Sequence, residues 1–211
     1  PISMLSFALN WYFTGANADA MKWTNIAIHA VTGMLVFGLA RTVLSMAMPT
    51  LTKTHASTAA FFCAALWTVH PINFTSVLYI VQRMESLAHL FVFGGLWLYL
   101  HGRTLALQGR GGRWQIVIGL LGGTMLAALC KETGVLLPLY AWLAEMCLPV
   151  LRTARDRRAI QVLYLAALWF PAVAGVLWLW PRFSAPEAWA ARDFGLAERL
   201  VTEGRVLLDY L

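Results

Sequence analysis

Charged residues are scarce in this sequence. They amount to 12% of the 211 residues, whereas hydrophobic residues amount to 60% and the mean hydropathy is +0.65. Soluble domains carry about 25% charged residues, so the composition excludes an ordinary soluble fold and predicts an all-α, polytopic bundle of transmembrane helices. The net charge of +6 does not indicate a nucleic-acid partner, because Lys and Arg in a membrane protein report its orientation instead. The first expected partner is therefore the lipid bilayer.

Cysteine is also scarce. The three cysteines, Cys63, Cys130 and Cys147, all lie in apolar runs. Their odd number and their spacing exclude a disulfide framework, and we interpret them as small packing residues. No spacing of His, Cys and carboxylate residues matches a metal motif either. The sequence therefore predicts no metal ligand, and it leaves open whether a divalent cation or another cofactor is needed.

The sequence has no initiator Met, no signal-peptide pattern, no internal repeat and no low-complexity segment. Pro1 leads directly into a mixed segment, and the chain stops at LLDYL. We interpret residues 1–211 as a single transmembrane domain taken from a longer protein.

Long apolar runs give the predicted spans, since about 20 residues at about 1.5 Å each cross a hydrocarbon core of about 30 Å. Residues 1–13 are too short to cross and predict an interfacial helix. Residues 181–211 predict an amphipathic segment that is extracytoplasmic or re-enters the membrane. One predicted span contains Gly119, Gly122 and Gly123, which favour close helix approach. The expected spans are residues 23–46, 56–70, 74–100, 114–130, 133–150 and 160–180.

Polar side chains interrupt the apolar run of residues 67–100. Each ionisable residue within a span costs about 2 to 3 kcal/mol on insertion scales, so such residues usually mark a site or pathway. If the chain is helical from Asn73 onward, one stripe of the helix is polar and predicts a wet cavity, with Arg83 at its edge. The alternative is that Glu85 pairs with His89 while Arg83 reaches the headgroups. The stripe consists of Thr75, Tyr79, Gln82, Glu85, Ser86 and His89.

Basic residues are unevenly distributed over the two sides of the membrane. The alternating loops place nine of the 16 basic residues and one acid, Asp156, on one side. The positive-inside rule assigns that side, which includes the Gly-rich linker of residues 101–113, to the cytoplasm. The other side has seven basic residues and eight acids. Five residues that could bind a ligand or take part in catalysis then lie together at the extracytoplasmic end of the bundle: His70, Arg83, Glu85, Lys131 and Glu132.

Two cations, two carboxylates and a histidine at membrane level suit a ligand that is both anionic and lipid-linked, such as a phosphate on a long isoprenoid. Arg83 would hold phosphate oxygens through its planar fork, and Lys131 would act as a point charge. These cations would also stabilise charge that develops on a phosphate leaving group. A carboxylate would serve as general base toward an acceptor hydroxyl.

Structural alternatives stay open for several of these residues. Lys131 and Glu132 form a solvated helix cap on one interpretation, and His70 before Pro71 simply ends a span. Asn25 and His29 share a face of the first span, where they either line the cavity or form a packing pair. Residue chemistry alone does not separate a transferase from a transporter.

Three segments carry a resemblance to a known family. They are HPIN at residues 70–73, VLYIVQRMESLAHLF at 77–91 and CKETGVLLPLYAWLAE at 130–145. The likeness continues in PISMLSFALNWYFTG, TNIAIH and LAERLVTEGRVLLDYL, so it covers nearly the whole chain. Together these segments resemble the multispanning glycosyltransferases of the GT-C class, particularly the bacterial relatives of the transmembrane and tetratricopeptide-repeat O-mannosyltransferases.

The resemblance implies transfer of a sugar from a polyprenyl-phosphate-linked donor to a protein, lipid or glycan acceptor, by an inverting single displacement on the extracytoplasmic face. It also implies a bacterial inner membrane, a site that faces the periplasm, and tetratricopeptide repeats after Leu211. In this class the catalytic base is usually an acidic residue in the first extracytoplasmic loop, which would precede Pro1. Within this sequence the candidate bases are Glu85 and Glu132.

The resemblance also bears on single residues. Glu85 stands where relatives often have a small residue or an Asp, but its place in the polar stripe keeps it among the substrate-binding candidates. By position, the other candidates match the motif segments of the family: His70, Gln82, Arg83, Lys131 and Glu132.

Two other functions compete with glycosyl transfer. A transporter or flippase for a lipid-linked anion would use the same cavity without reaction, and inverted repeats or broken helices at the bilayer centre would favour it. A membrane scaffold would use the polar stripe only to hold helices together. The sequence shows no repeat symmetry, and its charged groups lie at one end of the predicted bundle.

Overall fold

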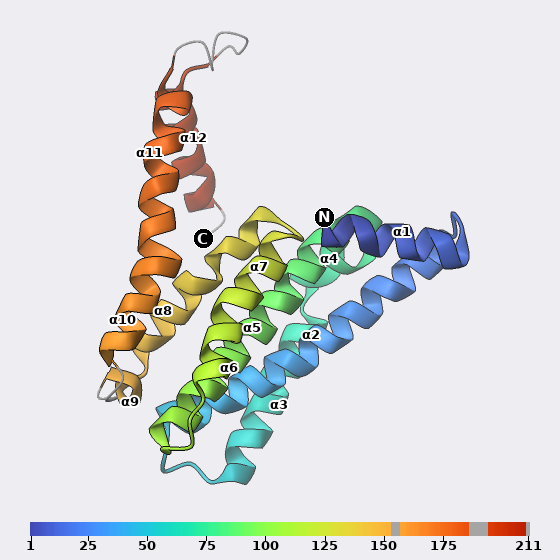
Figure 1. Ribbon diagram of the computed structural model, residues 1–211. Coiled ribbons are helices and arrows are strands. Elements are labelled where there is room, and N and C mark those ends of the chain that lie inside the picture. Colours follow the sequence, from blue (N-terminus) through green and yellow to red (C-terminus); the bar gives the residue numbers. More distant parts are fainter. Residues whose placement is uncertain (153–156, 186–193, 210–211) are drawn as a thin grey trace. The chain divides into compact units, whose positions relative to one another are not determined.

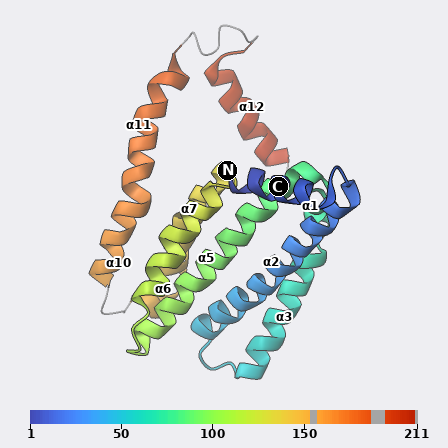
Figure 2. The same ribbon diagram turned by 45° about the vertical axis from the view of Figure 1, so that its right-hand side comes forward.

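The computed structural model describes residues 1–152, 157–185 and 194–209. Within these ranges every regular element is a helix, as Figures 1 and 2 show, which confirms the predicted all-α fold. The chain divides into two compact units, Pro1–Gln161 and Val162–Leu211, which are described separately. The site residues predicted from the sequence lie in the first unit.

The first unit contains one long central helix. α5 (Arg83–Leu107) packs against α2 (Ala18–Ala47) and also contacts α6 (Arg113–Val117), α7 (Gly123–Ala128) and α8 (Leu137–Cys147). α3 (Lys53–Val69) packs on the other side of α2, so that α2, α3 and α5 lie side by side in both views. The short helix α9 (Pro149–Arg152) follows α8. Because α5 continues to Leu107, the predicted cytoplasmic linker of residues 101–113 is wrong in its first half, which is helical.

The predicted single helix over residues 74–100 is also wrong at its beginning. A 3-10 turn at Pro71–Asn73, the five-residue α4 (Phe74–Leu78) and a second 3-10 turn at Ile80–Gln82 precede α5. Tyr79 between them is extended, with ψ at 118°. Pro71 prevents continuation of α3, and the chain bends by 47° between α3 and the segment Pro71–Leu78. Residues 71–82 are therefore a broken segment at one end of the bundle.

Glycines allow α5 to approach the helix that begins with α6. α6 leads through the π-helical turn η3 (Ile118–Gly122) into α7. A Cβ atom at Gly119 would lie 2.6 Å from the Tyr99 nitrogen and 2.7 Å from the Gly95 oxygen, and one at Gly123 would lie 2.9 Å from the Gly95 Cα. The backbones therefore meet with no room for a side chain. The expected close approach is confirmed for Gly119 and Gly123, whereas Gly122 faces only Ile118 of its own turn, at 3.6 Å.

Several of the described helices are long and apolar enough to cross a membrane. They are Ala18–Ala47, Ile80–Leu107 and Arg158–Ser184, and a fourth arises if Lys53–Val69 and Pro71–Leu78 form one bent span. Arg113–Ala128 is a shorter apolar helix. α8, within the predicted span 133–150, has only 11 residues after the 3-10 turn η4 (Glu132–Leu136).

The second unit consists of helices that expose much apolar surface. The end of α10 (Arg157–Tyr164) continues through the π-helical turn Leu165–Trp169 into α11 (Phe170–Ser184). Near the end of α11 the Arg182 guanidinium lies 3.8 Å from the Trp178 ring centroid. α12 (Leu196–Asp209) is amphipathic, as its sequence predicts, and exposes Leu200 and Leu207. Residues 186–193 and 210–211 of the predicted segment 181–211 lie outside the described residues.

α1 (Ile2–Thr14) has its polar side turned inward. Ser3 is buried, and Ser6 and Phe7 are half-buried. The outer surface is apolar, with Met4, Leu5, Leu9, Trp11, Tyr12 and Phe13 between 50% and 81% exposed. α1 crosses the end of the first unit at which α4 lies and α5 begins (Figures 1 and 2). This distribution is what a helix in the membrane interface needs, where aromatic side chains are favoured.

The glycine contact predicts opposite effects for two neighbouring substitutions. Gly119→Ala should destabilise the protein by about 1 to 3 kcal/mol, because the new methyl group pushes α5 and η3 apart. Gly122→Ala, which has room, should be neutral or stabilise by up to about 1 kcal/mol. Unfolding of the detergent-solubilised protein by increasing SDS measures both. Equal stabilities for the two variants would contradict the assigned packing.

Candidate functional site

The site is built around Glu85 and Lys131, which the structure brings together. Lys131 Nζ donates a hydrogen bond to Glu85 Oε1, and the Thr133 hydroxyl donates one of 3.4 Å to Glu85 Oε2. The Lys131 and Glu85 side chains are 25% and 22% exposed, so the pair lies at the surface of the unit and not in its core. The predicted convergence of these two residues is therefore observed. The alternative pair of Glu85 with His89 is wrong, because the exposed His89 ring stacks on Phe93 instead.

Backbone contacts fix the turn that carries Lys131. Lys131 is extended, with φ −153° and ψ 152°, and its N–H donates to the Ala127 oxygen at 2.9 Å. Gly134 packs so closely that a Cβ there would lie 2.3 Å from the Ala127 carbonyl carbon. α1 also contacts this turn, since the Ile2 N–H donates to the Leu129 oxygen at 3.1 Å and the Ser3 hydroxyl donates to the Cys130 oxygen at 3.3 Å. The backbone of Lys131 is thus held from two sides.

Arg83, at the start of α5, is fully buried and bonded to protein groups. Its Nε donates to Asn25 Oδ1 at 2.7 Å, Nη2 to the Met21 oxygen at 2.9 Å and Nη1 to the Ser6 oxygen at 3.2 Å. Its guanidinium also lies 4.5 Å from the centre of the Phe7 ring. The predicted reach of Arg83 to the headgroups is therefore wrong. The sequence analysis expected the guanidinium fork of Arg83 to hold a ligand. In the structure its donors are turned toward α1 and α2 instead.

Asn25 extends this contact to the broken segment of residues 71–82. Its Nδ2 donates to the Val77 oxygen at 3.1 Å and the Tyr79 oxygen at 3.3 Å, and the Tyr79 oxygen also accepts the Gln82 N–H at 3.0 Å. The Ser86 hydroxyl donates to the Ser76 oxygen at 2.8 Å. Arg83, Asn25 and Ser86 together fix the first turn of α5. Glu85 belongs to this turn, and these contacts set its position beside Lys131.

The remaining predicted residues lie around this end of the unit without meeting the pair through a described contact. His70 is exposed and its Nδ1 accepts a hydrogen bond of 3.2 Å from the Ile72 N–H, as expected of a residue that ends a span. Gln82 is half-buried at the junction of the second 3-10 turn and α5. Glu132 is exposed in the first turn of η4. The stripe of polar residues is thus distributed over several elements, because the chain bends at Tyr79.

His29 does not pair with Asn25. His29 Nε2 donates to the Thr68 oxygen of α3 at 2.8 Å, and its ring stacks on Trp67 with centroids 5.1 Å apart. Asn25 contacts Arg83 and the broken segment instead. Each of these polar residues therefore joins α2 to a different part of the chain.

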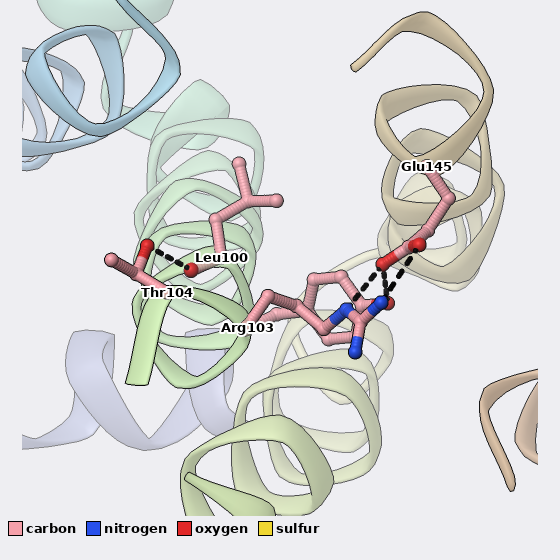
Figure 3. Close-up of polar contacts among 5 residues, drawn as sticks. Leu100, Arg103, Thr104 and Glu145 are labelled. Carbon is pink, nitrogen blue, oxygen red and sulfur yellow. Dashed lines mark hydrogen bonds and ion pairs between the residues drawn. The ribbon is translucent and has the colours of Figure 1, made fainter. Parts of the chain in front are cut away.

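A second polar cluster, missed by the sequence analysis, joins α5 to α8 (Figure 3). Arg103 Nε and Nη2 donate to Glu145 Oε1 and Oε2 at 2.7 and 3.2 Å, and the Tyr99 hydroxyl donates to Oε1 at 2.6 Å. The Arg103 and Glu145 side chains are 0% and 9% exposed. A carboxylate inside the apolar run of α8 was the available signal. This cluster lies roughly 27 Å from Glu85 along α5, and its bidentate geometry suits a structural role.

The described residues do not contain a group of three or more His, Cys, Asp or Glu side chains that could hold a metal ion. Cys63 and Cys147 are exposed free thiols, and Cys130 is a buried one. The chemistry that this end of the unit offers is therefore one ammonium group, one carboxylate beside it and a nearby exposed carboxylate.

Comparison with known proteins gives one informative similarity. No family model and no solved structure matches the chain. Over 157 residues, 74% of the chain, it is 31% identical to protein O-mannosyl-transferase Tmtc1 of Drosophila melanogaster, and it covers 16% of that protein. The similarity supports a relation to that protein. Together with the apolar helices, it supports an integral membrane protein.

The Arg83 contacts predict a strong structural effect. Arg83→Ala leaves the buried Asn25 Oδ1 without its donor, at about 1 to 3 kcal/mol. It also removes the hydrogen bonds to the Ser6 and Met21 oxygens, which are partly buried, at about 0.5 to 1.5 kcal/mol each. It should lower the stability of the protein by at least about 2 kcal/mol and expose residues 71–82 to protease. Arg83→Lys should restore only part of the loss, because an ammonium group cannot replace the fork.

Arg41→Ala is the matched control, since Arg41 is an exposed arginine of α2. SDS unfolding and limited proteolysis of the three variants measure the effect. A protease pattern of Arg83→Ala like that of Arg41→Ala would contradict the structural role of Arg83.

Proposed function

We propose that this chain is part of an integral membrane glycosyltransferase of the GT-C class that transfers a sugar from a polyprenyl-phosphate-linked donor. The observation that carries the proposal is the similarity to a protein named an O-mannosyl-transferase over 74% of this chain. The Lys131–Glu85 pair at one end of an apolar bundle also supports it, because it offers a cation for a phosphate and a carboxylate for a general base. The acceptor would be a protein, a lipid or a glycan on the extracytoplasmic face.

Lys131 is the proposed ligand of the donor phosphate. Its side chain is partly exposed, and hydrogen bonds from an ammonium group to phosphate oxygens are charge-assisted and strong. Val135 and Leu136 follow in the same segment and are 55% and 38% exposed. They offer exposed apolar surface within five residues of Lys131, which suits a lipid-linked phosphate. Lys131 would also stabilise the negative charge that develops on the departing phosphate.

Glu85 and Glu132 are the carboxylates proposed as general base within these residues. The base must lie within hydrogen-bond reach of the acceptor hydroxyl, and both carboxylates are near Lys131 in space or in sequence. The resemblance favours an acidic residue of the first extracytoplasmic loop for this role. His70 and Gln82 are proposed to contact the sugar or the acceptor. Arg83 is proposed to position Glu85 by fixing the first turn of α5.

Transport of a lipid-linked anion is not favoured, because Tmtc1, to which the chain is similar, is a transferase by name. The proposed orientation places the Glu85–Lys131 end outside the cytoplasm, as the distribution of Lys and Arg predicts. In a bacterial cell this is the periplasmic face of the inner membrane. Tetratricopeptide repeats are proposed for the complete protein, by analogy with the family that the sequence resembles.

The proposal predicts that transfer depends on Lys131. Membranes with the full-length protein should transfer sugar from at least one donor in a panel of radiolabelled polyprenyl-linked sugars. Lys131→Ala should lower the rate by about 10- to 100-fold, the worth of a charge-assisted hydrogen bond. Lys22→Ala is the control, because Lys22 pairs at 3.8 Å with Asp19 on an exposed part of α2.

Full transfer by the Lys131→Ala variant would remove Lys131 from the site. The absence of transfer from every donor, with donor binding that still requires Lys131, would support transport instead.

A further inference from the structure

The two cation-carboxylate pairs along α5 differ in their surroundings. The Arg103–Glu145 pair is bidentate, and its side chains are 0% and 9% exposed. The Lys131–Glu85 pair is made by a single ammonium group, and its side chains are 25% and 22% exposed. A buried pair is costly to break because its partner charge stays unpaired. A partly exposed pair gains little net free energy, so a better partner can replace either member.

A phosphate group is such a better partner for Lys131. A phosphate monoester such as farnesyl phosphate carries a charge of about −1.5 to −2 and three acceptor oxygens. The phosphodiester of a polyprenyl-phosphate-linked sugar carries one negative charge, and it becomes such a monoester when the sugar leaves. The Glu85 carboxylate carries one charge and also accepts a hydrogen bond from Thr133. The lysine side chain has a flexible stem, and its ammonium group has three donors that can reorient. The Lys131 ammonium group can therefore change its partner from the Glu85 carboxylate to a phosphate by side-chain rotation alone.

The backbone around the pair supports an exchange of this kind. The turn of Lys131 is held by Ala127, Ile2 and Ser3. The first turn of α5 is held independently by Arg83 and Ser86. None of these contacts uses the Lys131 ammonium or the Glu85 carboxylate. Loss of the pair therefore leaves both segments in place.

We propose that Glu85 is a built-in competitor for the anion site of Lys131. Without a ligand, the Glu85 carboxylate accepts the hydrogen bond of the Lys131 ammonium group. A phosphate-bearing ligand takes over the ammonium group and releases the carboxylate, which keeps its hydrogen bond from Thr133. The proposal rests on the proposed function, since it assumes that Lys131 binds the phosphate of a donor. It adds that the pair discriminates between anionic and neutral lipids, because a neutral lipid cannot displace Glu85 from Lys131. After the exchange, the freed Glu85 carboxylate lies next to the bound anion.

The test is a binding measurement on the full-length protein in detergent micelles, with farnesyl phosphate, inorganic phosphate and farnesol as probes. Glu85→Gln removes the competing charge and should raise the affinity for farnesyl phosphate by about fivefold, the worth of a partly exposed ion pair. The affinity for farnesol should not change. Asp19→Asn is the matched control, because it removes one carboxylate from the other lysine pair of the unit, and it should leave the affinity for farnesyl phosphate unchanged.

A double variant separates exchange from general electrostatics. In a Lys131→Met background, Glu85→Gln should give no gain, because no ammonium group is left to release. The same fivefold gain without Lys131 would overturn the exchange, and so would a loss or no change of affinity in Glu85→Gln alone. Glu85→Ala serves as a second variant if the Gln protein is unstable.

The probes also separate this proposal from the proposed function. If inorganic phosphate follows the Glu85→Gln and Lys131→Met pattern while farnesyl phosphate binds no better than farnesol, the exchange holds and the lipid-linked donor is refuted. If farnesyl phosphate is bound but all Glu85 variants bind it like the parent protein, the exchange is overturned and the donor site remains. If the parent protein and the Glu85 variants bind neither phosphate probe, the exchange is overturned.

Discussion

The buried guanidinium of Arg83 is the interaction on which the arrangement of the Glu85–Lys131 end of the unit depends. A desolvated cation is costly unless its donors are satisfied, and here they are satisfied by oxygens from α1, α2 and Asn25. The same Asn25 side chain bonds two carbonyls of the broken segment. Helices that have no hydrophobic driving force between them in lipid are thus fixed by directed hydrogen bonds. These hydrogen bonds fix the first turn of α5 and, with it, the position of Glu85.

α5 connects two polar ends of different character. Toward its C-terminus, Tyr99 and Arg103 bind Glu145 in a buried and geometrically matched cluster that fastens α8. Between the ends, the close contact of Gly95 with Gly119 and Gly123 brings α5 and α7 together. At its N-terminus the side chains of the Glu85–Lys131 pair are partly exposed. The rigid part of the unit therefore supports an end whose charged groups are accessible, which is how binding sites are commonly held.

Much of this could be predicted from the sequence. Composition alone gives the helical class, and the glycine pattern gives the contact at Gly119 and Gly123. The side assignment of charged residues grouped Glu85 and Lys131 with His70, Arg83 and Glu132, and of these five only Glu85 and Lys131 bind each other. The role of Arg83 could not be predicted, because two of its partners are backbone oxygens that carry no sequence signal, and the third, Asn25, lies 58 residues away in the sequence. The bend at Tyr79 was missed for a similar reason: a local sequence compatible with a helix is overridden by Asn25 from another helix. The Arg103–Glu145 cluster was missed because the end of α5 has no strong stop signal, so Arg103 was assigned to the linker of residues 101–113.

α1 contacts the segments that hold both Lys131 and Glu85. Its outer surface is apolar and aromatic, while its inner side touches both the Lys131 turn, through Ile2 and Ser3, and Arg83, through Ser6 and Phe7. A displacement of α1 therefore acts on both halves of the charged pair at once. The distance between an ammonium group and a carboxylate then depends on a helix that carries no charged side chain of its own.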